Sequence, residues 1–310
     1  MSHEIVRLEA VRLFIGAAGL QQRWEILLKS SHSAAALRSC IHGVHVAHST
    51  VCRGRGLFAS ADLEPGSIVG FYPVHAVGIA CAQGLHRWMW PSDADSFREA
   101  AQDPERQHCV QTLTHKSLEQ LVQSSHAAAA MMEEPPVEIF IDACDRPLQN
   151  GWLGHIINDA DVCQSGDEEE VIRYLRRGCE LSNCFNVPLG PAPLMASVTT
   201  RRVCRNEELL TSYFPSFWLP LERLPDFDDA SDELEEWSDL LTSQRDACED
   251  ASCRKFSKET ALLGEWMSRF TPHSRRFRGM GTVAAGPHDV DEIIDDVEHI
   301  FTPAPNIKTV

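Results

Sequence analysis

The sequence predicts an α+β protein that is rich in short strands at its centre and helical towards both ends. The stretch from Ser49 to Tyr72 has the pattern of two short strands, with glycines before the first strand and a Pro65-Gly66 turn between the two. Two further runs, 137–141 and 183–214, are also rich in β-forming residues. Helical spacing of apolar residues marks the start of the chain and the part after residue 218. We therefore expect several small, twisted sheets flanked by helices.

Residues 1–42 are predicted to form an N-terminal helical segment. Its apolar residues recur at helical spacing: Ile5, Leu8, Val11, Leu13, Leu20, Trp24 and Leu27. Charged residues such as Glu4 and Arg7 interrupt this apolar pattern, which argues against a secretory signal peptide. A helix that packs on the body is favoured over an organellar address.

The β-rich body spans residues 43–218 and is interrupted at about 74–136. Ser92–Gln102 begins like a capped helix, and His115–Met132 has a helical pattern that Pro135-Pro136 would end. We therefore predict an inserted helical subdomain at this place.

The part after the body divides into two regions. Residues 219–275 are predicted to be helical and acidic, because apolar residues such as Leu234, Trp237 and Leu241 recur at helical spacing. Residues 276–310 contain several glycines and prolines and are predicted to form a flexible tail.

The net charge of −17 is concentrated in two places. Residues 226–250 contain eleven acidic side chains and one basic side chain, and residues 289–298 contain six acidic and no basic ones, so the remainder carries only −1. Direct nucleic-acid binding is not expected, because it normally requires a basic face. The acidic segments can attract basic protein tails, although a solvated surface is the favoured alternative.

The eleven cysteines form no C-x-x-C pair, which is typical of free thiols in a reducing compartment. An intracellular location, nuclear or cytoplasmic, is therefore expected, and no apolar run is long enough for a membrane span. No metal site is predicted. His42, His45 and His48 would alternate between the two faces of a strand and could not converge on one ion.

Three segments carry the functional signal, and each combines a short strand pattern with polar residues. The first motif comprises Gly54–Ala59 (GRGLFA), Gly66 and Phe71-Tyr72; the second comprises Ile141-Asp142, Gly151 and Ile156–Asp159; the third comprises Asn206–Tyr213 (NEELLTSY). In order, spacing and content they resemble the motifs of the SET-domain family of protein lysine methyltransferases. Two of the chain's three tyrosines, Tyr72 and Tyr213, fall on that family's functional tyrosine positions.

The resemblance implies a SET-type fold for residues 43–218, in which the second and third motifs meet through a threaded (pseudoknot) crossing. It also implies an S-adenosylmethionine-dependent protein lysine N-methyltransferase. The partner would be a protein substrate, histone or non-histone, for which a basic tail is one candidate. The inserted subdomain would either shape one wall of the substrate groove or serve as a plain structural insert.

The resemblance also implies roles for individual residues. Tyr213 would orient the amine near the transferred methyl group, and Tyr72 would line the lysine channel. The cofactor-binding residues would be Arg55, Gly56, Leu57, Asn158 and Asp159. Many members of the family carry zinc-binding cysteine clusters beside the domain, and this chain shows no such cluster.

The chain departs from the family pattern at several places. His155-Ile156 stands where the family has Arg-Phe, and no Ser-Cys or Pro-Asn follows directly after Asp159. Asp159 stands where the family has His, and Asn206 stands where it has Gly. An insertion that carries Asp167 and three glutamates separates Asn158 from Asn183. These departures leave a second hypothesis open, namely a SET-like protein-binding module that has lost catalysis.

Overall fold

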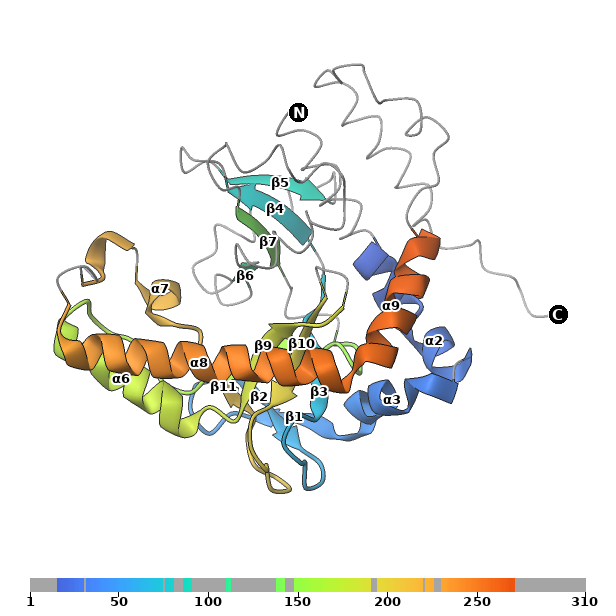
Figure 1. Ribbon diagram of the computed structural model, residues 1–310, viewed down its shortest axis with the longest axis horizontal. Helices are drawn as coiled ribbons and strands as arrows, with labels where there is room; N and C mark the ends of the chain where they lie inside the picture. The colour runs from blue at the N-terminus through green and yellow to red at the C-terminus, as the bar shows by residue number, and fades with distance from the viewer. Residues whose placement is uncertain are drawn as a thin grey trace, which may run out of the picture.

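The computed structural model describes residues 16–30, 32–74, 76–80, 86–90, 110–112, 138–142, 148–190, 194–219, 221–225 and 230–270. These residues form a mixed α+β structure in which several small sheets are flanked by helices (Figure 1). The predicted α+β class is therefore confirmed. The expected tail at 276–310 lies outside the described residues.

The N-terminal helical segment packs on the sheets through one large aromatic side chain. Residues 16–22 are helical and are followed by α2 (Trp24–Ser30), η1 (His32–Ala34) and α3 (Ala35–His42). The Trp24 ring meets Phe71 at 5.3 Å and Trp152 at 5.5 Å between ring centroids, both edge-on. Trp24 is 1% exposed. This buried aromatic group joins the N-terminal helices to β3 and to the segment that contains Trp152.

The strands of the body lie in three small sheets. Two are antiparallel: β1 (Val44–His48) pairs with β2 (Arg55–Ala59), and β10 (Met195–Thr199) lies between β3 (Ile68–Phe71) and β9 (Cys184–Pro188). The predicted Pro65-Gly66 turn lies between β2 and β3, with Gly66 at φ +70°. The third sheet is a short parallel pair of β8 (Asn158-Asp159) and β11 (Leu210-Thr211).

A fourth sheet occupies part of the segment in which a helical subdomain was expected. It has the order β5-β4-β7-β6, formed by β4 (Ala76–Ala80), β5 (His86–Trp90), β6 (Val110–Thr112) and β7 (Glu138–Asp142). The described residues of the insertion are therefore strands, whereas the helices predicted at Ser92–Gln102 and His115–Met132 lie outside the described residues. The pairing of β6 with β7 joins residues that are far apart in the chain, and a local pattern does not contain that information.

Long helices pack along the body. Figure 1 shows α6 (Glu168–Leu181) running beside α8 (Asp232–Lys255), which continues past β9 and β10 towards α9 (Ser257–Phe270). Ser231 caps α8 by accepting a hydrogen bond from the Leu234 amide, and Leu234 and Leu241 are fully buried. The remaining short helices are η4 (Gly154–Ile156), α7 (Pro215–Trp218) and η5 (Leu221–Arg223). In the part of the chain that the structure describes, no helix has both the length and the apolar character to cross a membrane.

Gly151 offers a test of the contact between the N-terminal helices and the body. It has φ +86°, and a Cβ atom placed on it would lie 2.4 Å from the Trp24 indole nitrogen. We expect Gly151→Ala to lower the free energy of unfolding by about 2–4 kcal/mol, because backbone strain and steric overlap add. Chemical denaturation measures this change. Gly54→Ala is the matched control, because its Cβ would have 3.9 Å of clearance; equal losses in the two variants would contradict the packing of Trp24.

Candidate functional site

The structure brings the three motifs together. In the parallel pair, Asn158 is opposite Leu210 and Asp159 is opposite Thr211, so the second and third motifs are adjacent. The first motif joins the third through a bridge between Phe58 and Glu208. Residues from three distant parts of the sequence thus meet at one place.

Asn183 closes this arrangement after the insertion. Its side-chain oxygen accepts a hydrogen bond from the Leu210 amide at 2.9 Å, and its side-chain nitrogen donates to the Glu208 carbonyl at 2.8 Å. Its own amide donates to the Leu210 carbonyl at 2.9 Å. The chain therefore leaves the second motif, forms α6 and returns to the third motif. Asn158 and Asn183 are separated in the sequence, but in space both lie beside Leu210.

The carboxylate of Glu208 is the polar centre of the three motifs. It accepts hydrogen bonds from the Ser49 hydroxyl (2.7 Å), the Thr50 amide (2.6 Å) and the Thr50 hydroxyl (2.5 Å). The side-chain amide of Asn158 donates to it as well, at 3.1 Å. Burial opposes ionisation, but these hydrogen bonds outweigh it and hold the pKa of Glu208 below its ordinary value. The ionised carboxylate therefore fastens the 49–50 loop to Asn158.

Gly56 lies directly against this carboxylate. A Cβ atom on Gly56 would be 2.1 Å from Glu208 Oε1 and 3.2 Å from the Asn158 side-chain nitrogen. The resemblance implies that Gly56 binds the cofactor, and in the structure the close neighbour of Gly56 is Glu208. A pattern of glycines cannot distinguish these two neighbours, because both need the space that a Cβ would fill.

The predicted cofactor residues of the first and second motifs are in contact. The Asn158 side-chain amide donates to the Arg55 carbonyl at 2.9 Å. Arg55 and Asn158 are half-buried, so parts of both reach the surface. Leu57 is fully buried, and its carbonyl accepts a hydrogen bond from the Leu209 amide at 2.7 Å.

Tyr213 follows β11 and is held at both ends. Its hydroxyl donates to the Ile157 carbonyl at 2.5 Å, and its backbone amide donates to Asp159 at 3.2 Å. The ring packs edge-on against Phe217, 4.7 Å between centroids, and lies nearly parallel to Trp218 at 6.4 Å. Because Tyr213 is half-buried, it lies where the packed interior meets the surface.

Tyr72 contacts the short segment 155–157 through His155. It is 4% exposed, and its ring is edge-on to His155 at 6.3 Å between centroids. His155 precedes Ile157 by two residues, and Ile157 accepts the hydrogen bond of Tyr213. The two predicted catalytic tyrosines therefore contact the two ends of segment 155–157.

Asp159 points into the protein. It is 7% exposed, and its carboxylate accepts hydrogen bonds from the Tyr174 hydroxyl at 2.6 Å and the Trp218 indole at 2.7 Å. Burial raises its pKa to about 6, and the hydrogen bonds offset part of this effect. The side chain thus faces the interior, and the residue itself lies in the parallel pair with Thr211.

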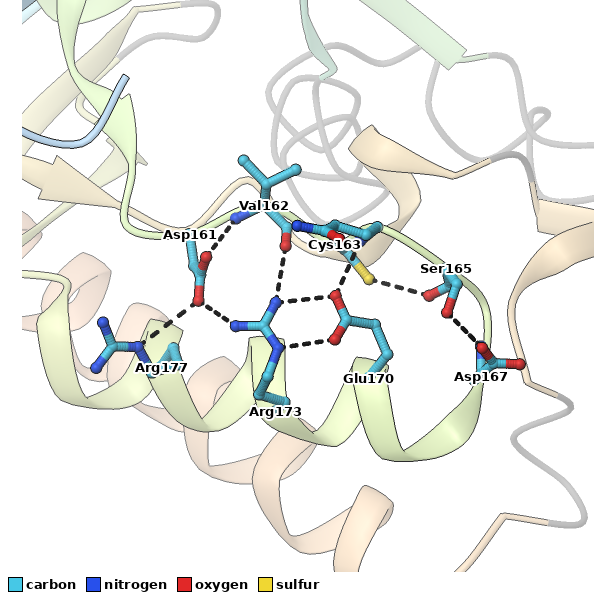
Figure 2. A network of polar contacts seen from close by, with 9 residues as sticks. Asp161, Val162, Cys163, Ser165, Asp167, Glu170, Arg173 and Arg177 are labelled. Atoms are coloured by element: carbon cyan, nitrogen blue, oxygen red, sulfur yellow. Dashed lines mark hydrogen bonds and ion pairs between the residues drawn. The ribbon is translucent and has the colours of Figure 1, made fainter. Parts of the chain in front are cut away.

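An ion-pair network fixes the loop that follows Asp159. Figure 2 shows the Arg173 guanidinium between Asp161 and Glu170, with Arg177 also directed at Asp161. Arg173 donates as well to the Val162 carbonyl at 2.9 Å. The hydrogen bond from Arg173 is the main cause that lowers the pKa of Glu170 to about 2. This network ties residues 161 and 162 of the loop to α6.

Asn206 explains one departure from the family pattern. It adopts φ +66°, a conformation that glycine tolerates best and that asparagine tolerates better than most other residues. The turn before Glu207 therefore keeps a left-handed backbone with Asn in place of Gly.

Several residues of the site were not identified from the sequence. Asn183, Glu208, Tyr174 and Trp218 all make side-chain hydrogen bonds to motif residues. Glu208 lay inside a recognised motif, which was the only available signal. Among the described residues, no group of three or more His, Cys, Asp or Glu side chains is arranged to hold a metal ion.

The contact between Gly56 and Glu208 can be tested by a double-mutant cycle. We expect Gly56→Ala to lower the free energy of unfolding by about 2–4 kcal/mol, because the new methyl group displaces a hydrogen-bonded carboxylate. Combined with Glu208→Ala, the loss should be smaller than the sum of the single losses by at least about 1 kcal/mol. Denaturant titration provides the four values. Gly54→Ala replaces Gly56→Ala in the control cycle and should be additive; additivity in both cycles would contradict the contact.

Comparison with known proteins yields no family assignment. No protein-family model matches the chain, and no curated protein sequence is significantly similar to it. The function is therefore inferred from the three motifs and from the contacts that join them.

Proposed function

We propose that this protein is an S-adenosylmethionine-dependent protein lysine N-methyltransferase with a SET-type, threaded fold. The observation that carries the proposal is the parallel pairing of Asn158-Asp159 with Leu210-Thr211, beside the bridge from Phe58 to Glu208. This arrangement puts the Tyr213 hydroxyl on the Ile157 carbonyl, one residue before Asn158. The second and third motifs thus meet beside Tyr213, and the first motif joins them at Glu208.

The residues at this place suit a cofactor that has both polar and apolar parts. Arg55, Asn158 and Tyr213, one residue from each motif, are half-buried, so each of them is partly at the surface. In the proposal, the backbone of Arg55, Gly56 and Leu57 and the pair Asn158-Asp159 hold S-adenosylmethionine. When bound, this cofactor supplies an electrophilic methyl group on a sulfonium.

Positioning accounts for most of the proposed catalysis. A lysine nitrogen must be neutral and in line with the methyl group, and no metal or acid is needed to activate a thioether leaving group. Aromatic surroundings favour the neutral amine, because burial of an ammonium is costly. In the proposal, the Tyr213 hydroxyl, which donates to Ile157, accepts a hydrogen bond from the amine when substrate is bound. Tyr72 would line the lysine channel from the side of His155.

The substrate in this proposal is a protein, and a basic tail is one candidate. Exposed carboxylates on α8 that could attract it include Asp232, Glu235, Glu236, Asp239 and Asp250. Their attraction for a basic segment would weaken with rising salt.

A binding module without catalysis is the second candidate function. It is favoured by one observation: the Glu208 carboxylate lies directly beside Gly56, one of the residues that the resemblance implies for cofactor binding. Asn206 no longer favours it, because this residue keeps the left-handed backbone.

Calorimetry with S-adenosylmethionine and transfer of a radiolabelled methyl group separate the two candidates. The acceptors are histones and the proteins of a cell lysate. The enzyme proposal predicts stoichiometric cofactor binding and label on lysine. Folded protein that binds no cofactor, or that binds it and labels no protein, would favour the binding module.

Tyr213→Phe tests the proposed role of the tyrosine. The substitution removes one hydroxyl and keeps the ring, so the contacts with Phe217 and Trp218 remain. We expect turnover to fall by roughly 10- to 1000-fold, as for the loss of one preorganised polar contact at a reacting centre. Cofactor affinity should stay within about threefold. Methylation of the same substrate at the wild-type rate would show that Tyr213 has a different role.

Asn158→Ala tests the proposed cofactor site. The variant loses the hydrogen bonds to Arg55 and Glu208, and we expect S-adenosylmethionine binding to weaken by about 1–3 kcal/mol. The Glu208 carboxylate keeps its three donors from Ser49 and Thr50, so the protein should remain folded. Calorimetry measures the affinity and circular dichroism checks the fold. An unchanged affinity would reject the placement of the cofactor beside Asn158.

A further inference from the structure

One carboxylate oxygen collects hydrogen bonds from three parts of the chain. Oδ2 of Asp159 accepts from the Tyr174 hydroxyl in α6 at 2.6 Å and from the Trp218 indole in α7 at 2.7 Å. It also accepts from the backbone amide of Tyr213 at 3.2 Å. Helix α6, helix α7 and Tyr213 are therefore all hydrogen-bonded to one oxygen atom.

The corner that Asp159 holds has a strained backbone. Phe214, the residue after Tyr213, has φ +68°, which is rare for a bulky residue. Its amide donates to the Ser212 hydroxyl at 3.3 Å, and this hydroxyl is 3.2 Å from the Tyr174 hydroxyl. Such a conformation persists only where surrounding contacts fix it. Tyr174 and Asp159 provide these contacts from one side.

We propose that Asp159 is a positioning residue that sets the place of Tyr213 and makes it depend on helix α6. Asp159 acts through the Tyr213 amide and through the Trp218 ring that lies parallel to Tyr213. The Tyr213 hydroxyl, fastened to Ile157, is then fixed relative to Asn158, the neighbour of Asp159 in β8. The activity part of this inference rests on the proposed function, and the positioning part does not.

Protonation of Asp159 should loosen the corner. The ionised carboxylate is an acceptor only, so Oδ2 can take all three donors, whereas a protonated carboxyl must also donate a proton. The titratable side chains that interact with it are Tyr174 from α6 and Cys163 from the following loop. Asp161 faces it through its backbone amide, which donates to Oδ1 at 3.4 Å. Because burial raises the pKa of Asp159 to about 6, the ionised form predominates above about pH 6 and is lost as the pH falls through that value.

Nuclear magnetic resonance of the nitrogen-labelled full chain tests the positioning directly. The Trp218 indole resonance, assigned through Trp218→Phe, should titrate with a midpoint near pH 6 in the wild type. It should be flat over the same range in Asp159→Asn. Glu169→Gln is the matched control, because it removes one exposed negative charge from α6 and leaves Asp159 and the Arg173 network intact; its titration should follow the wild type.

Kinetics provides the second readout. We expect Asp159→Asn to lower kcat at pH 8 by about 10- to 100-fold, the scale of a misplacement of about 1 Å, with KM for S-adenosylmethionine within about threefold. The inflection of the kcat profile near pH 6 should disappear, whereas the rise that comes from deprotonation of the substrate lysine should remain. Tyr174→Phe removes one donor and keeps the ring, so its loss of kcat should be smaller. Glu169→Gln should stay within about twofold of the wild type.

The outcomes separate the two proposals. If the wild type transfers no methyl group, the proposed function fails, and the Trp218 titration alone decides the positioning role. A Trp218 resonance that does not titrate near pH 6 in the wild type would overturn the inference. So would Asp159→Asn and Tyr174→Phe variants that are folded and active with the wild-type kcat and pH profile.

Discussion

The hydrogen-bonded carboxylate of Glu208 is the interaction on which the candidate site depends. It is 6% exposed, and an ionised group at such a place is tolerated only where donors satisfy it. Ser49 and Thr50 supply donors from the loop before the first motif, and Asn158 supplies one from the second. The close approach to Gly56 is a consequence, because only a residue without a Cβ leaves room for the carboxylate. One buried charge thus gives three distant segments a common place.

The carboxylate of Asp159 joins helix α6 to the site, just as the carboxylate of Glu208 joins the three motifs. Asp159 accepts hydrogen bonds from the Tyr174 hydroxyl and from the Tyr213 amide, and thereby joins α6 to Tyr213. The Arg173 network fixes the loop between Asp159 and α6 on the outer side. The inserted helix is therefore part of the site's support, and its packing against α8 connects that support to the C-terminal helices.

Local features of the fold could be predicted from the sequence. The Pro65-Gly66 turn, the strands on either side of it and the helix that contains Leu234 and Leu241 all follow from residues close together in the chain. The β-rich run at 137–141 corresponds to β7, but β4, β5 and β6 were not predicted, because these strands gain stability from partners far away in sequence. Helix α6 was also missed, although Asp167 and three glutamates stand where a helix begins. For the site, the motifs located Asn158, Asp159 and Tyr213, but the direction of the Asp159 side chain depends on Tyr174 and Trp218, which no motif contains.

A crystal structure with S-adenosylhomocysteine, the product of methyl transfer, tests the central claim most directly. That claim is that the three motifs meet in one site around Tyr213. The account predicts polar contacts from the product to the backbone of Arg55–Leu57 and to Asn158-Asp159, with its sulfur directed at Tyr213. Product bound elsewhere on the protein, or Asn158 and Leu210 found apart, would contradict it.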